Sequence, residues 1–153
     1  MINQGAVIDP TGCYRYSLWR VWHPKGSRVA FIMLNPSRAD ATVDDPTIRR
    51  CIGFAQHWGY GSLEVVNLFA YRTSNPARLK QMRDPVGPEN DHYLKQAMEW
   101  GTLTILAWGN RGNFNQRSQQ VLSWLTPWEN LYCLGVTRSG HPRHPLYLKR
   151  ETK

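Results

Sequence analysis

The longest uninterrupted apolar run of the chain is VAFIML, residues Val29–Leu34. Its length suits one β-strand and falls far short of the roughly 20 residues that a membrane-spanning helix needs. Continuous apolar runs, unlike alternating ones, are typical of a central parallel strand that helices cover on both faces. This run therefore predicts the middle of an α/β sheet, and we expect no membrane partner.

Further apolar runs alternate with helix-like segments along the rest of the chain. The runs are Leu63–Phe69, Leu103–Trp108 and Leu131–Val136, and the helix-like segments are Pro46–Trp58, Glu89–Trp100 and Gln116–Leu125. Parallel strands need crossover connections, which helices commonly supply. The order predicts a three-layer αβα fold, an open and mainly parallel four-stranded sheet with helices on both faces.

Another β-rich segment, Tyr14–Trp22, precedes the central run. The sequence HPKGS joins it to residues 28–34, and a Pro/Gly turn between two β-rich runs predicts a hairpin. We expect an antiparallel N-terminal strand at the edge of the sheet. Because no repeat, low-complexity tract or long linker interrupts the sequence, residues 1–153 are expected to form a single α/β domain.

The charge balance favours an acidic partner. The chain has 19 Lys and Arg residues against 11 Asp and Glu residues, a formal charge of +8. Excess basic charge attracts polyanions, so a nucleic acid or a nucleotide is the partner to consider. Net charge alone determines neither a fold nor a reaction.

The sequence lacks the common cofactor and metal motifs. Cys13, Cys51 and Cys133 are odd in number and far apart, which fits neither a disulfide framework nor a zinc or iron–sulfur motif. Neither a GxGxxG fingerprint nor a Walker P-loop occurs. We therefore expect no cofactor and no metal. The first residues lack the features of a secretory signal, which favours a cytoplasmic location. The oligomeric state is left open.

Polar residues gather where the predicted parallel strands end. Ligands of open α/β sheets bind in the crevice beyond the carboxyl ends of the strands. These ends carry NPSRAD (35–40), Asn67 with AYR (70–72), GNRG (109–112) and TRSGHPRHP (137–145). A helix that starts at Pro46 would aim its positive end nearby. Such a set of groups suits an anionic ligand with a polar, planar part.

Several of these residues also have ordinary structural explanations. Asn35 precedes a proline, which is a common turn arrangement. Asp44 and Asp45 precede Pro46 and suit a helix cap. A histidine pair in the tail lacks a third metal ligand at a sensible spacing. Asn67 is harder to explain in this way, because it lies between apolar neighbours where β-propensity gives no reason for an amide.

The quoted segments resemble a known family over most of the chain. LNPSRADATVDDPTIRRCIGFAQHWGYG, VVNLFAYRTSNP, ILAWGNRG and GHPRHPLYL look like the bacterial and phage domain-of-unknown-function family numbered 1643, across roughly Tyr14–Leu148. This resemblance implies no activity.

A more distant resemblance does imply an activity. IMLNPSRADA is similar to the first motif of the uracil-DNA glycosylase superfamily, whose mismatch-specific branch reads G-[IM]-N-P-G at a strand end. EVVNLFAYRTSNP and ILAWG resemble two later strand ends of that superfamily, and HPRHPLYL resembles its HPSPLS-type motif. The superfamily has a four-stranded parallel sheet between helices, the same architecture that the periodicity predicts.

The superfamily resemblance implies roles for individual residues. Asn35 would position the attacking water, although many members have Asp or Glu there. His144, or alternatively His141, would donate a hydrogen bond to the base oxygen that gains charge. Asn67 would read the base edge. Candidates for substrate binding are Pro36, Asp40, Asp45, Asn67, Gly109 and His141.

The same resemblance implies contacts to DNA. A base inside a duplex must be flipped into the pocket, and phosphate contacts offset the unstacking. The phosphate-binding candidates are Arg38, Arg49, Arg72, Arg111, Arg138 and Arg143. The position where the superfamily places a stacking aromatic holds Thr47, which leaves Phe54 and Tyr71 as guesses.

The sequence thus predicts a hydrolase that removes a modified or deaminated base from DNA, with DNA preferred to RNA as its partner. An alternative is a catalytically inert module that binds a nucleic acid or a nucleotide in the same crevice. A third possibility is hydrolysis or transfer on free nucleotides.

Overall fold

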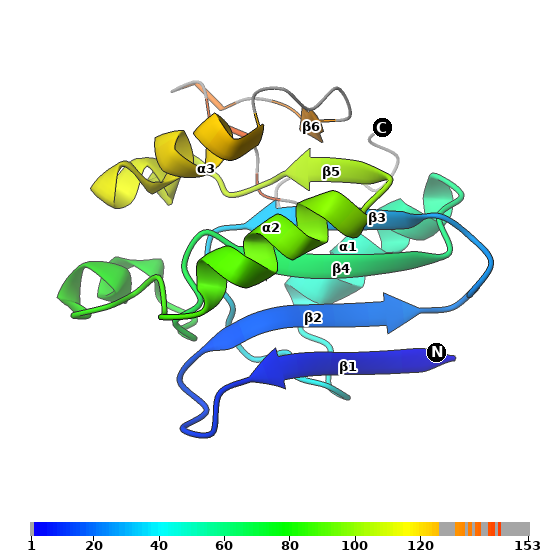
Figure 1. Cartoon of the computed structure of the whole chain (residues 1–153), viewed down its shortest axis with the longest axis horizontal. Coiled ribbons are helices and arrows are strands. Elements are labelled where there is room, and N and C mark those ends of the chain that lie inside the picture. Colours follow the sequence, from blue (N-terminus) through cyan, green and yellow to red (C-terminus); the bar gives the residue numbers. More distant parts are fainter. Residues whose placement is uncertain are drawn as a thin grey trace.

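The fold is built on one six-stranded sheet (Figure 1). The computed structural model describes residues 2–125, 131–133, 135, 137–138, 141–142 and 144. Across the sheet the strands follow the order β1-β2-β4-β3-β5-β6. The strands are β1 (Asn3–Ile8), β2 (Arg15–Val21), β3 (Arg28–Met33), β4 (Ser62–Asn67), β5 (Leu103–Leu106) and β6 (Leu131–Cys133).

Four of these strands are parallel, as the alternating pattern predicts. β3 pairs in parallel with β4 on one side and with β5 on the other, and β5 pairs in parallel with β6. Phe31 of β3 is in register with Val65 of β4 and Ile105 of β5. The apolar run in β3 is fully buried because it has a strand on each side and a helix layer on each face.

The helices form a layer on each face of the sheet, which confirms the three-layer prediction. They are α1 (Pro46–His57), α2 (Asn90–Trp100) and α3 (Arg117–Leu125), with short 3₁₀ segments at Pro76–Gln81 and Asn110–Gln116. Figure 1 shows α2 in front of the sheet and α1 behind it. Alternate residues of β3 accordingly join different cores: Phe31 packs with the α1 side, and Ile32 packs with the α2 and α3 side.

The start of α1 follows from its local sequence. The Asp45 side chain caps the helix by accepting a hydrogen bond from the Ile48 backbone N–H at 2.9 Å, and Pro46 occupies the first turn. The chain leaves the helix through Gly59, whose φ of +87° suits glycine. The cap at Asp45 thus fixes where α1 begins, beyond the end of β3.

The predicted hairpin between Tyr14–Trp22 and residues 28–34 is wrong. Both segments contain strands, but β4 lies between them, and β2 pairs antiparallel with β4 instead of with β3. The HPKGS connection wraps around Gly61: the carbonyl of Gly61 accepts from the N–H of His23 at 2.9 Å, and its own N–H donates to Ser27 O at 2.9 Å. A Cβ on Gly61 would lie 2.7 Å from the backbone of Gly26, so this crossing needs glycine.

The antiparallel part of the sheet is also larger than predicted. β1 was not expected from the sequence, and it pairs antiparallel with β2 at the edge. The sheet therefore has two antiparallel strands beside four parallel ones, instead of four strands with one possible antiparallel edge strand. Because β2 runs against β4, the first residue of β2, Arg15, lies at the carboxyl end of β4, where its N–H donates to Ala70 O at 3.0 Å.

None of the helices within residues 2–125 or the described positions after them is long and apolar enough to cross a membrane.

Candidate functional site

A pocket of about 550 Å³ opens beyond the carboxyl ends of the parallel strands. Its walls come from the loops that follow β3, β4 and β5 and from His144 beyond β6. The chain passes from β3 to β4 on one side of β3 and later to β5 on the other, and ligands of open α/β sheets bind at such a switch point. Its volume lies within the usual range for small-molecule sites.

A smaller recess of about 40 Å³ adjoins this pocket. Asn35, Ser37, Asp45, Thr47 and His144 line both spaces. The floor of the recess is formed from the sheet, by residues of β2, β3 and β4. A space of this size admits a few atoms, such as the polar edge of a ring whose remainder occupies the larger pocket.

Asn67, the last residue of β4, lines the recess with an unpartnered amide. The residue is fully buried, and neither its Oδ1 nor its Nδ2 has a hydrogen-bond partner among the described residues. Its backbone oxygen accepts a hydrogen bond from Asn90 Nδ2 at 2.8 Å. Burying an amide without partners costs free energy, because the hydrogen bonds with water are lost. An unpartnered donor and acceptor at this place are ready to bind a ligand.

Arg15 lines the same recess and was not among the residues predicted from the sequence. Its side chain is buried, its Nη1 donates to Ala39 O at 3.2 Å, and its Nε has no partner among the residues that the structure describes. Burial lowers the pKa of Arg15 to about 10, while the nearby Asp45 carboxylate opposes the shift. Arg15 therefore remains a cation at neutral pH. The sequence feature that could have indicated Arg15 is its position in the β-rich segment Tyr14–Trp22, where a basic residue lies in a predicted strand.

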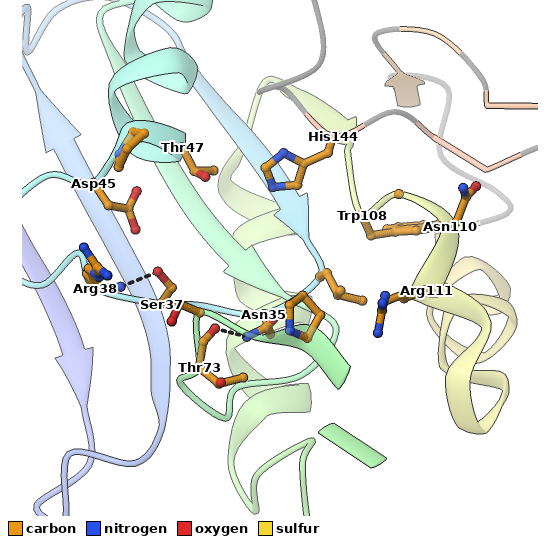
Figure 2. Close-up of a pocket in the computed structure, with 15 residues that line it drawn as sticks. Asn35, Ser37, Arg38, Asp45, Thr47, Thr73, Trp108, Asn110, Arg111 and His144 are labelled. Carbon is orange, nitrogen blue, oxygen red and sulfur yellow. Dashed lines mark hydrogen bonds between the residues drawn. The ribbon is translucent and has the colours of Figure 1, made fainter. Parts of the chain in front are cut away.

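Asp45 and His144 face the pocket together. Figure 2 shows both side chains with Thr47 between them, across the pocket from Asn35. The Asp45 carboxylate is engaged by Ile48 N at 2.9 Å and Ala39 N at 3.3 Å. Burial lowers the pKa of His144 below its usual value of 6.5, and the Asp45 charge acts in the opposite direction. His144 is thus mainly neutral at pH 7, and a neutral imidazole carries one ring N–H.

Asn35 ties two loops together at the pocket wall. Its Nδ2 donates to Thr73 O at 2.9 Å and to Pro36 O at 3.0 Å, with a longer contact to Tyr71 O at 3.4 Å. Figure 2 shows the bond to Thr73 as a dashed line. The amide nitrogen is therefore used by backbone carbonyls, whereas Oδ1 makes no hydrogen bond to the described residues. Only this oxygen is available to a ligand or a water.

A family model described as "Protein of unknown function (DUF1643)" matches residues 15–146, which is most of the chain. The chain belongs to the DUF1643 family. No curated protein and no solved structure matches it.

The arginines predicted to bind phosphate are dispersed in this DUF1643 protein. Arg38 and Arg111 line the pocket, and Figure 2 shows them on either side of Asn35. Arg72 instead donates to the backbone oxygens of three residues in neighbouring loops, and Arg49 donates to Asp44 O at 3.1 Å. Arg138 is exposed and does not line the pocket, and Arg143 lies outside the described residues.

Other predicted substrate-binding residues divide in the same way. Gly109 lines the pocket and Pro36 lines the recess. Asp40 lines neither space. Its Oδ1 accepts hydrogen bonds from Thr42 N and Val43 N in a local turn. His141 also lies outside both spaces, with its backbone paired to Thr137, so His144 is the histidine that the fold brings to the pocket.

The aromatic side chain at the pocket differs from the sequence guesses. Phe54 stacks on Trp58 in the core, and Tyr71 packs edge-on against Tyr14. Trp108, just beyond β5, lines the pocket instead, together with Thr47. The sequence marks Trp108 only as the end of an apolar run. Among the described residues, no three His, Cys, Asp or Glu side chains gather as a metal site.

Proposed function

We propose that this DUF1643 protein is a uracil-DNA glycosylase-like hydrolase that removes a modified or deaminated base from DNA. The observation that carries the proposal is the convergence of Asn35, Asn67 and His144, from the ends of different strands, on one recess. The four parallel strands between helix layers support the corresponding finer proposal, a uracil-DNA glycosylase-like fold.

Each of the three residues offers a group that N-glycosidic hydrolysis needs. Asn67 presents a free amide donor and acceptor to the edge of a base. A neutral His144 donates to a base oxygen, and donors aimed at developing charge commonly make the largest electrostatic contribution to catalysis. The Oδ1 atom of Asn35 holds a water. The water oxygen bonds to C1′ as the C1′–N bond breaks, and the electron pair of that bond leaves with the base. The water loses one proton to solvent, and the departing base anion takes up one proton from solvent.

The surroundings of the recess suit a flipped nucleotide. The larger pocket leaves room for the sugar and a flanking phosphate once the base edge enters the recess. Arg38 and Arg111 are exposed at its walls, and such cations attract phosphates in a salt-dependent way. Trp108 lines the same wall, although its side chain is almost fully buried.

Strand cleavage at abasic sites tests the proposed reaction. Oligonucleotides with uracil, hypoxanthine or hydroxymethyluracil are incubated with the protein and then treated with alkali, and strand breaks are expected for at least one of these bases. His144→Ala should lower the rate about 100-fold, as removal of a transition-state donor typically does. His57→Ala is the matched control, because His57 is exposed at the end of α1 and outside the pocket. Absence of breaks across a broad panel at high protein concentration would contradict the proposal.

The inert binding module remains a second candidate because of Asn35. Its amide nitrogen is held by backbone carbonyls, and it occupies the position where many members of the superfamily have a carboxylate. This alternative predicts salt-sensitive binding of DNA, RNA or nucleotides without any product. Turnover of any substrate by the wild-type protein, lost in His144→Ala, would exclude it.

A further inference from the structure

Arg15 differs from the other deeply buried arginines of the described chain in having no described carboxylate within ion-pair distance. Arg20 pairs with Asp44 at 2.9 Å, and Arg117 pairs with Asp91 at 2.6 Å. No ion pair of Arg15 with a described residue falls within 4 Å, and the one hydrogen bond of its side chain to a described residue, to Ala39 O, is 3.2 Å long. A buried cation outside ion-pair contact is costly, and the nearby Asp45 carboxylate offsets this cost only in part, because burial still lowers the pKa of Arg15.

The place where Arg15 is buried indicates what compensates it. Its guanidinium lines the 40 Å³ recess together with Asn67, and both side chains keep polar atoms without partners there. Arg15 Nε offers an N–H donor, Asn67 Nδ2 offers a second donor, and Asn67 Oδ1 offers an acceptor. Asp45 lines the recess as well, but its carboxylate already accepts hydrogen bonds from Ile48 N and Ala39 N. The two unpartnered donors therefore favour an occupant with electron-rich acceptor atoms.

These groups match one type of base edge. An imide, C(=O)–N(H)–C(=O), has two acceptors and one donor, which complement two donors and one acceptor. Pyrimidines and purines with two such oxo groups carry this edge. An amino base such as cytosine places an NH₂ group where the recess offers donors, and that donor would remain unpaired.

We propose that Arg15 is a ligand-binding residue which, with Asn67, makes the recess a receptor for the imide edge of a dioxo base and favours a base that carries negative charge on its imide oxygens. The inference rests on the proposed function in taking the ligand to be a nucleobase. It adds a cationic contact that would also stabilise the negative charge on a departing base, because that charge spreads over the imide oxygens.

Binding of free bases tests the proposal without requiring any bond cleavage. The wild-type protein is titrated at pH 7 with uracil, cytosine and barbiturate, an anion that retains the imide edge, and dissociation constants are measured from NMR chemical-shift changes. Uracil should bind at least tenfold more tightly than cytosine, and barbiturate at least tenfold more tightly than uracil. Equal binding of uracil and cytosine would overturn the proposal, as would binding of acetate or inorganic phosphate as tight as that of barbiturate.

Variants separate a ligand contact from a structural role. Arg15→Met should reduce the barbiturate-to-uracil affinity ratio to within about twofold of one, whereas Arg15→Lys should preserve the order of the two ligands. The matched control is Arg78→Met, because Arg78 is exposed and outside both spaces. An unchanged ratio in folded Arg15→Met would overturn the proposal. If Arg15→Met does not fold, the wild-type ligand order and Arg15→Lys still decide it.

The outcome of this binding test does not depend on the outcome of the strand-cleavage assay. Strand cleavage by a protein that binds uracil and cytosine equally would leave the hydrolase proposal standing and remove the role of Arg15. Selective imide binding without any cleavage would do the reverse.

Discussion

The Nδ2 atom of Asn35 donates a hydrogen bond to the backbone oxygen of Thr73 at 2.9 Å, and this bond joins the loop after β3 to the loop after β4. The same nitrogen also faces the oxygens of Pro36 and Tyr71. An amide fits this cluster of carbonyls, because it supplies donors. A carboxylate would face the same oxygens with acceptors only. Asn35 thus has a structural role in joining the two loops, in addition to its proposed role in holding a water.

Asn35→Asp should therefore destabilise the protein. The substitution removes the donor and places negative charge against carbonyl oxygens, and we expect a loss of about 2 kcal/mol in the free energy of unfolding at pH 7. Urea unfolding measures it. Asn35→Ala is the control for charge: it also removes the donor but adds no repulsion, so its loss should be smaller. Equal stability of Asn35→Asp and wild type would contradict the hydrogen-bond assignment.

The Asp45 cap gives a second prediction. Asp45→Ala leaves the Ile48 N–H without its acceptor and should cost about 1 kcal/mol in unfolding free energy. Asp45→Asn keeps a side-chain oxygen and should retain most of the stability. The comparison is made by thermal or urea unfolding of the three proteins. A loss of stability as large in the asparagine variant as in the alanine variant would show that charge, and not capping, is the main contribution.

The same Asp45→Asn variant should alter His144. Because the Asp45 charge raises the pKa of His144 while burial lowers it, removal of that charge should lower the His144 pKa further below its wild-type value. An NMR titration of the His144 ring protons measures the change. The ring signals of His57, exposed at the far end of α1, are the control and should not differ between the two proteins at any one pH. A rise in the pKa of His144 would contradict the proximity of the two groups.

The lowered pKa of His144 also predicts how stability depends on pH. A histidine whose pKa is lower in the folded than in the unfolded state binds fewer protons when folded. Its contribution to stability is therefore present above pH 6.5, the ordinary pKa, and is lost as the pH falls through the folded-state value. Unfolding free energies measured from pH 7.5 downward in wild type and His144→Gln should show a steeper decline in wild type. Parallel profiles would count against burial of the imidazole.

The crossing at Gly61 gives a prediction about the fold. A Cβ on Gly61 would lie 2.7 Å from the Cα of Gly26 and even closer to a backbone carbonyl, so Gly61→Ala should cost about 2 kcal/mol or more. Gly53, in the middle of α1, is the matched control, since a Cβ there meets nothing within 4 Å. Gly53→Ala should instead stabilise the protein by about 0.5–1 kcal/mol. Similar effects of the two substitutions in urea unfolding would contradict the close approach of the two backbones.

The local part of this structure was predictable from the sequence. The continuous apolar run in β3 and the helical periodicity of the segments after it depend on which faces a residue exposes, and neighbouring residues encode that. The capping pattern at Asp45 and Pro46 also depends on atoms a few residues apart. The sequence alone placed Asn35, Asn67 and His144 at strand ends, and the rule for open α/β sheets then placed all of them at one edge.

Strand order and the floor of the recess depended on tertiary contacts. The turn-forming residues of HPKGS are compatible with direct pairing of β2 and β3 and also with a wider connection between them. The position of β4 between these two strands, with Gly61 against the connection, decides for the second arrangement. That insertion turns β2 antiparallel to β4 and brings Arg15 to the carboxyl end beside Asn67. The sequence by itself determined the helices, the parallel strands and their polar ends, but not β1. The tertiary structure decided which ends share one cavity, because burial, charge compensation and hydrogen bonding between distant residues arise only when the sheet is assembled.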